Sequence, residues 1–197
     1  MDVTGFNMKK IISFSALLLL SAAIGTLFFA FQEAPKTGTA IGDAAPEIKI
    51  GGVDGKFITL SSLKGKMVLV DFWASWSGPC RTENPNLVLA YNKYKNAKFK
   101  NATGFEIYSI SLDNQKEAWI KAIGKDNLYW PNHVSELMYW NDKTTKVFGI
   151  NTLPSNILID GNGIILAKNL TGRVPDSEGK PTQVSKIEAE LIKHLKQ

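Results

Sequence analysis

The sequence predicts an α/β domain over residues 41–197, in which strands and helices alternate. Residues 68–70 form a short apolar, β-branched run typical of a buried parallel strand, which Phe72 and Trp73 extend, and a helical segment follows after Ser77. Strand-like and helix-like segments continue to alternate, and a hairpin and a last helix close the chain. The 197 residues are 44% hydrophobic and 21% charged, which is typical of a globular protein. No internal repeat or second linker divides this region, so one domain is expected.

The first half of the domain is predicted to hold an N-terminal β-hairpin, the central strand and one helix. Alternating residues and turn chemistry predict the hairpin, and the helix begins after Ser77 and ends before Phe99. The expected segments are strand 48–50, turn 51–56, strand 57–60, a short turn or single helical turn at 61–65, and strand 67–73.

The second half is predicted to hold three strands, three helices and a central insertion at about residues 112–140. Asn114 and Glu117 have the spacing of a capping box that opens a helix. Residues 129–141 are rich in aromatic side chains and show no regular period. The further expected segments are strand 105–112, helix 144–148, strand 155–160, turn 161–163, strand 164–170, and a closing helix with Val184, Ile187, Leu191 and Leu195 on one face.

The first 40 residues predict a membrane anchor and a tether. Residues 11–31 carry no charged side chain, follow Lys9 and Lys10, and approach the ~20 residues that span a bilayer. We therefore expect a cytoplasmic segment at 1–10, a signal-anchor helix at 11–31, a tether at 32–40 and an extracytoplasmic domain. A cleaved signal peptide is the alternative, although the end of the run, at residues 28–32, is a poor cleavage context. No cysteine follows the run, which excludes a lipoprotein anchor.

The charge pattern argues against nucleic-acid binding. The chain has a formal net charge of +5, but its lysines are scattered and its only arginines are Arg81 and Arg173. Nucleic-acid binding would favour a concentrated basic patch that contains arginine. We therefore expect no nucleic-acid partner.

The residues after the central strand carry the candidate chemistry. Ser77, Gly78 and Pro79 end the strand and place Cys80 in the first turn of the next helix, where free N–H groups and the helix dipole favour negative charge. Cys80 is the only cysteine, so the chain cannot form an intramolecular disulfide. This thiol is therefore either buried and inert or part of a site.

The segment from Phe72 to Arg81, Phe-Trp-Ala-Ser-Trp-Ser-Gly-Pro-Cys-Arg, resembles the active site of the thioredoxin superfamily. The family has Cys-x-x-Cys, and this chain has Ser77 at the position of the N-terminal, nucleophilic cysteine. The resemblance implies a thioredoxin-like fold, preceded here by one transmembrane helix. It also implies thiol–disulfide exchange without a cofactor, and it places Trp76, Gly78 and Pro79 at the substrate-facing turn.

A second stretch resembles the same superfamily. In the family, a cis proline begins the later strand and packs against the cysteine pair, and the preceding backbone binds the substrate chain. Pro154 and Leu153 hold these positions. The hairpin, the insertion and the anchor resemble the TlpA/ResA-like branch, whose partners would be thiols of exported proteins or a membrane electron donor. By the same resemblance, Asp71 and Glu83 match acidic residues near the cysteine pair.

Ser77 limits the reactions that this site could carry out. A serine hydroxyl is not ionised near neutral pH and forms no stable bond to sulfur, so Ser77 cannot take part in two-cysteine exchange. Nearby Asp71 and Glu83 would also disfavour a thiolate at Cys80. Three hypotheses stay open: a degenerate oxidoreductase that binds partner chains at a groove formed by Trp76, Leu153 and Pro154, an oxidoreductase that uses a partner's thiol, and a one-cysteine peroxidase that uses Cys80.

Other chemistries have little support. The one-cysteine peroxidase family is resembled by the motif Ser77-x-x-Cys80-Arg81-Thr82-Glu83. That family carries an arginine where this chain has Pro154. The two histidines, His133 and His194, are distant in the sequence from both Ser77 and Cys80. We therefore expect neither a Ser-His-Asp hydrolase nor a metal site.

Overall fold

The computed structural model describes residues 34–175 and 181–196. The chain divides into two compact units, Met1–Ala34 and Pro35–Gln197, and the described helices and strands all belong to the second. The predicted cytoplasmic segment and signal-anchor helix lie outside the described residues. Among the residues that are described, no helix combines the length and apolar character needed to cross a membrane.

A five-stranded mixed sheet forms the centre of the second unit, and its strand order is β5-β4-β3-β6-β7. The central strand β3 runs parallel to β4 and antiparallel to β6, β4 pairs in parallel with β5, and β6 pairs antiparallel with β7. The strands are β3 (Met67–Trp73), β4 (Phe105–Ser111), β5 (Asn132–Val134), β6 (Ser155–Ile159) and β7 (Ile165–Lys168). The fold confirms the predicted thioredoxin-like α/β class for this unit.

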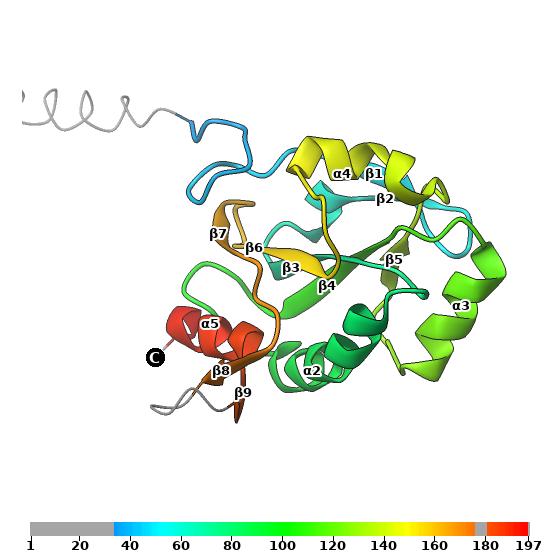
Figure 1. The fold of residues 1–197 in the computed structure, drawn as a ribbon. Helices are drawn as coiled ribbons and strands as arrows, with labels where there is room; N and C mark the ends of the chain where they lie inside the picture. The colour runs from blue at the N-terminus through cyan, green and yellow to red at the C-terminus, as the bar shows by residue number, and fades with distance from the viewer. Residues whose placement is uncertain (1–33, 176–180, 197) are drawn as a thin grey trace, which may run out of the picture. The chain divides into compact units, whose positions relative to one another are not determined.

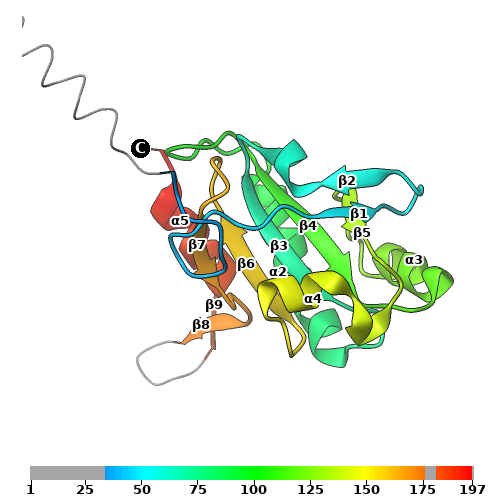
Figure 2. The same ribbon diagram turned by 90° about the horizontal axis from the view of Figure 1, so that it is seen from above.

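Residues of β3 alternate between two buried layers, because successive strand side chains point to opposite faces. Met67, Leu69 and Trp73 pack in the cluster that includes residues of α2 (Gly78–Tyr94), α3 (Lys116–Lys125) and α5 (Lys186–His194). Val68, Val70 and Phe72 pack in the other cluster. Figures 1 and 2 show α2 and α5 on one face of the sheet and α4 (Lys143–Phe148) with the β1/β2 hairpin on the other.

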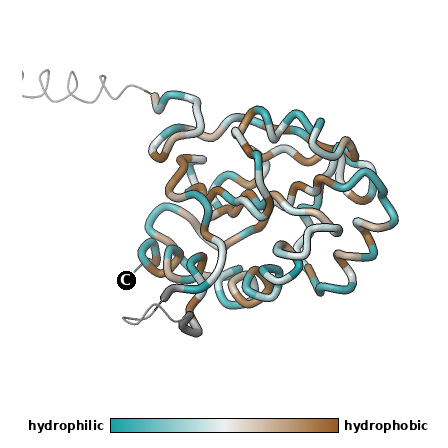
Figure 3. Tube along the Cα trace, viewed as in Figure 1, coloured by the Kyte–Doolittle hydropathy of each residue, from teal (hydrophilic) through white to brown (hydrophobic). Residues whose placement is uncertain are grey.

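The remaining elements complete the two layers. The N-terminal hairpin is β1 (Lys49–Gly51) and β2 (Phe57–Thr59), and η1 (Leu60–Leu63) is the predicted single helical turn. A second small hairpin, β8 (Arg173–Pro175) and β9 (Pro181–Ser185), precedes α5. Figure 3 shows hydrophobic residues gathered along the central strands and polar residues on the outer turns.

The predicted capping box at Asn114 and Glu117 is wrong. Helix α3 begins at Lys116, its N-cap is Gln115, and no side chain caps it. Glu117 is therefore the second helical residue, whereas a capping box requires the acid at the third. The helix itself is present, and its buried residues are Trp119 and Ala122.

The sequence-based prediction missed strand β5 and the β8/β9 hairpin. Residues 129–141 are not wholly irregular, since they contain β5 and the 3-10 turn η2 (Tyr139–Asn141). A three-residue strand is too short to show a period, and β5 is held by its pairing with β4. Val184 belongs to β9 rather than to the closing helix, which begins at Lys186 after Ser185 accepts a 3.1 Å hydrogen bond from the Glu188 amide.

Candidate functional site

The predicted site begins where β3 ends. Ser77 is the N-cap of α2, and its hydroxyl oxygen accepts a 3.3 Å hydrogen bond from the Cys80 amide. This contact satisfies one of the free N–H groups at the helix start, which is the usual role of a serine cap. Gly78 and Pro79 occupy the first two helical positions and are exposed. The structure thus confirms that Ser77 and Cys80 lie together at a helix start.

Cys80 is a buried thiol. Its side chain is only 1% exposed, and Ser77, which precedes it by one turn, is 6% exposed. Burial raises the pKa of Cys80 to about 11, and the Asp71 charge acts in the same direction, although the Ser77 hydroxyl partly opposes the shift. Desolvation therefore outweighs the favourable helix start, and the thiol is overwhelmingly protonated at neutral pH.

A row of buried polar side chains lies on the sheet face that α2 covers. Asp71 on β3 is in register with Ser109 on β4 and with Asn156 on β6. Burial and the nearby Glu83 raise the pKa of Asp71 to about 7, while a hydrogen bond to Ser109 lowers it. Ser109 also accepts a 3.0 Å hydrogen bond from the Trp130 indole, so the row continues into the insertion.

Glu83 lies on α2, one turn after Cys80, and is 8% exposed. One carboxylate oxygen accepts hydrogen bonds from the Asn86 side chain and from the Gly172 amide, at 3.1 and 3.0 Å. The other oxygen is buried without a hydrogen-bond partner in the structure. The predicted Asp71, Cys80 and Glu83 are therefore all buried and close enough to affect one another: the Glu83 charge acts on Asp71, and the Asp71 charge acts on Cys80.

Two carboxylates hold the turn that carries Ser77, and sequence reasoning missed both. Asp113, just after β4, accepts hydrogen bonds from the amide and the hydroxyl of Ser75 at 2.9 and 2.5 Å. Asp126, at the end of α3, forms a bidentate ion pair with Arg81, which also donates to the Ser75 carbonyl at 3.1 Å. These partners are 38 and 45 residues away along the chain, so no local pattern could identify them.

The Leu153–Pro154 peptide bond is cis, as predicted. Pro154 directly precedes β6, whose first residue, Ser155, is in register with Phe72 near the end of β3. The Ser155 hydroxyl donates to the Thr152 carbonyl at 2.8 Å and holds the turn before the strand. The proline loop therefore lies beside the end of β3, from which the Ser77 turn leads.

Trp76 is 45% exposed and lies in a group of aromatic rings that was not predicted. Its ring centroid is 5.0 Å from that of Tyr139 and 6.5 Å from that of Trp140. Both partners come from the insertion. The aromatic character of residues 129–141 was visible in the sequence, but its pairing with Trp76 depends on tertiary structure.

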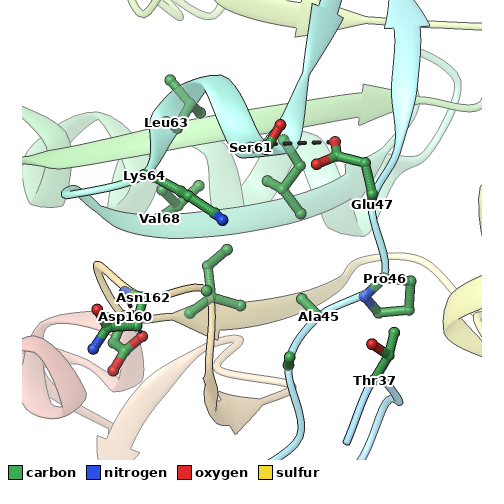
Figure 4. A pocket seen from close by; sticks show the side chains of 14 residues that line it. Thr37, Ala45, Pro46, Glu47, Ser61, Leu63, Lys64, Val68, Asp160 and Asn162 are labelled. Atoms are coloured by element: carbon green, nitrogen blue, oxygen red, sulfur yellow. Dashed lines mark hydrogen bonds between the residues drawn. The ribbon is translucent and has the colours of Figure 1, made fainter. Parts of the chain in front are cut away.

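A well-formed cavity elsewhere in the unit contains none of the predicted site residues. It measures about 320 Å³ and lies between residues 37–47, η1 and the start of β3 (Figure 4). Val68 and Ile159 line its apolar part, and Glu47, Lys64 and Asp160 are its charged lining residues. Because Val68 lies near the start of β3 and Ser77 follows its end, this cavity is separate from the Cys80 site. Within the described ranges, no group of His, Cys, Asp and Glu side chains could hold a metal ion.

The sheet order, the Ser-x-x-Cys helix start and the adjacent cis proline define a thioredoxin-like protein. The chain belongs to the Redoxin family, whose model matches residues 40–191. It is a TlpA/ResA-like member of the thioredoxin superfamily.

Sequence relatives agree with this assignment. The thiol-disulfide oxidoreductase ResA of Bacillus cereus is 32% identical over 155 residues, which cover 77% of this chain and 82% of that protein. ResA of Bacillus subtilis is 29% identical over 161 residues, which cover 82% and 84% of the two chains.

Solved structures give the same result. The thioredoxin domain of a thiol-disulfide oxidoreductase from Bacteroides vulgatus superposes with a TM-score of 0.60 at 38% identity, and the match covers 68% of this chain and 90% of that one. A thiol-disulfide oxidoreductase from Bacteroides fragilis gives a TM-score of 0.59 at 35% identity, with coverages of 66% and 92%.

Proposed function

We propose that this protein keeps the substrate-binding surface of a thiol-disulfide oxidoreductase but has lost two-cysteine catalysis, and that it binds polypeptides which carry exposed cysteines. The observation that carries the proposal is the replacement of the nucleophile by Ser77 in an otherwise complete site. Three features support it: Ser77 caps a helix start, the Leu153–Pro154 bond is cis, and Asp71 is buried.

The contacts of Ser77 explain why disulfide reduction would be lost while binding of a partner chain is kept. Disulfide reduction requires a thiolate that attacks sulfur and a second thiol that resolves the mixed disulfide. Ser77 supplies neither, and its hydroxyl is used to cap the Cys80 amide. Cys80 retains the resolving position, but burial keeps it protonated and shielded. The exposed Gly78, Pro79 and Trp76 remain available for contact with a partner chain.

A one-cysteine peroxidase is less well supported. Such an enzyme needs a low-pKa thiolate that peroxide can reach. Here burial raises the pKa of Cys80 to about 11, and Pro154 stands where that family carries an arginine. The relatives identified by sequence are also thiol-disulfide oxidoreductases.

Binding of an unfolded polypeptide tests the proposal directly. Reduced ribonuclease in excess dithiothreitol exposes free cysteines and forms no lasting disulfide, so any binding to it is noncovalent. We expect the natural protein to bind it with a change in tryptophan fluorescence, and Trp76→Ala to weaken that binding. Tyr129→Ala, which removes another exposed ring of the insertion, is the matched control and should bind normally. Equal affinity of the Trp76→Ala variant and the natural protein would refute a binding surface beside Ser77.

We also propose that the domain acts outside the cytoplasm, attached by the apolar run at residues 11–31. Support comes from the length of that run and from the lysines that precede it. N-terminal sequencing of the protein from native membranes tests the attachment. We expect the intact leader, whereas a mature start near Gln32 would contradict an anchor and leave export in place.

A further inference from the structure

Large aromatic side chains are exposed beside position 77. We call Trp76, Tyr139 and Trp140 the aromatic cluster; Tyr139 and Trp140 meet edge to face with ring centroids 6.3 Å apart. Trp76 is 45% exposed and Tyr139 43% exposed, and the neighbouring Met138 is 53% exposed. Large apolar side chains are normally stabilised by burial, so this group of exposed side chains beside Ser77 is unusual.

The backbone holds this surface in an unfavourable conformation. Leu137 and Tyr139 have φ angles of 56° and 54°, in the left-handed region that bulky residues rarely adopt. Such residues persist where the surroundings fix them and where their placement serves a function. Ser135 provides the fixation, because its hydroxyl donates to the Ser111 carbonyl at 2.7 Å and accepts from the Leu137 amide at 3.0 Å. Tyr139 keeps 43% of its surface exposed despite this backbone, so full burial of the ring does not account for the strain.

The aromatic cluster is continuous with the surface expected to bind a partner chain. Trp76 is the residue before Ser77, so the cluster begins at the turn that a partner's cysteine must approach. Trp140 and Leu153 both pack against the core cluster that contains Phe72, so both reach the same side of the sheet. A polypeptide bound along Leu153 would thus carry side chains near its cysteine over the rings.

We propose that the aromatic cluster is a specificity subsite that accepts a large apolar side chain, aromatic above all, next to the cysteine of a bound polypeptide. This inference rests on the proposed function and names the class of partner. Aromatic rings favour other rings in stacked or edge-to-face contact, beyond the gain from buried area. The expected preference for phenylalanine over glycine at that position is five- to tenfold, which corresponds to about 1–1.4 kcal/mol.

A trapping experiment measures the preference without catalytic turnover. In the double variant Ser77→Cys with Cys80→Ser, the introduced thiolate attacks the peptide sulfur of a peptide–glutathione disulfide. The protein–peptide disulfide forms, and glutathione leaves as a thiolate that takes up a proton. Mass spectrometry at equilibrium compares Phe-Cys and Gly-Cys peptides. We expect the phenylalanine peptide to be trapped five- to tenfold more.

Further substitutions in the double variant assign the preference to the ring of Tyr139. Tyr139→Ala should reduce it to less than twofold, and Tyr139→Phe should keep it because the ring remains. Tyr129→Ala is the matched control, since Tyr129 is 69% exposed in the same segment but lies outside the cluster, and it should keep the full preference. Equal trapping of both peptides would overturn this inference alone. Failure to trap either peptide would instead overturn the proposed function.

Discussion

The reactivity of Cys80 follows quantitatively from its burial. Burial raises the pKa of this thiol to about 11. At pH 8 only about one thiol in a thousand is then a thiolate, against about a quarter for an ordinary cysteine with a pKa near 8.5. Because alkylation requires the thiolate, we expect iodoacetamide to modify the folded protein at least ~200-fold more slowly than the unfolded chain. The 1% exposure of the side chain should slow the reaction further.

The assay compares labelling rates of native and guanidinium-unfolded protein between pH 6 and pH 10, with mass spectrometry as the readout. The native rate should rise steadily with pH over this whole range, because the thiol titrates above it. The unfolded chain should instead level off near pH 9. A native rate that levels off below pH 8, or that approaches the unfolded rate, would refute the reasoning. A fast, saturable reaction with peroxide that Cys80→Ser abolishes would favour the peroxidase alternative.

Two further predictions concern the groups around the site. Arg81→Ala should lower the free energy of unfolding by about 1–3 kcal/mol in urea denaturation, because it removes the cation that pairs with the largely buried Asp126 and leaves it only the hydrogen bond from Asn84. A loss below ~0.5 kcal/mol would contradict a stabilising Arg81–Asp126 ion pair. For Asp71, burial raises the pKa from 3.8 to about 7, so the folded protein holds a proton that the unfolded chain releases between these values. Stability should therefore fall as pH rises from 4 to 7, and Asp71→Asn should remove this dependence and stabilise the protein at pH 8 on the order of 2–4 kcal/mol. Parallel unfolding curves of the two proteins across that range would contradict a buried, protonated Asp71.

Strong local patterns made most of the fold predictable. The apolar run of β3, the hairpin at β6 and β7 and the helix after Ser77 each carry a clear period or turn. The elements that were missed are stabilised by contacts rather than by their own sequence. Strand β5 exists because it pairs with β4, and β9 ends where Ser185 caps α5.

The candidate site divides in the same way. Ser77, Cys80 and Pro154 could be identified because they lie within two continuous motifs. Asp113 and Asp126 could not, because their role depends on approaching Ser75 and Arg81 across a long separation in the sequence. The helix start suggested a stabilised thiolate, yet burial reverses that effect at Cys80, and only the structure shows how completely this side chain is enclosed.

Reduction of insulin by dithiothreitol tests the central claim most directly. The natural protein and Ser77→Ala should not accelerate the precipitation of insulin chains, because neither has an attacking thiol. Ser77→Cys should accelerate it, and the new thiol should form a disulfide with Cys80 one helical turn away. Family-like activity of the natural protein would contradict the argument from the missing thiolate. A Ser77→Cys variant that forms its disulfide yet stays inactive would show that more than the sulfur has been lost.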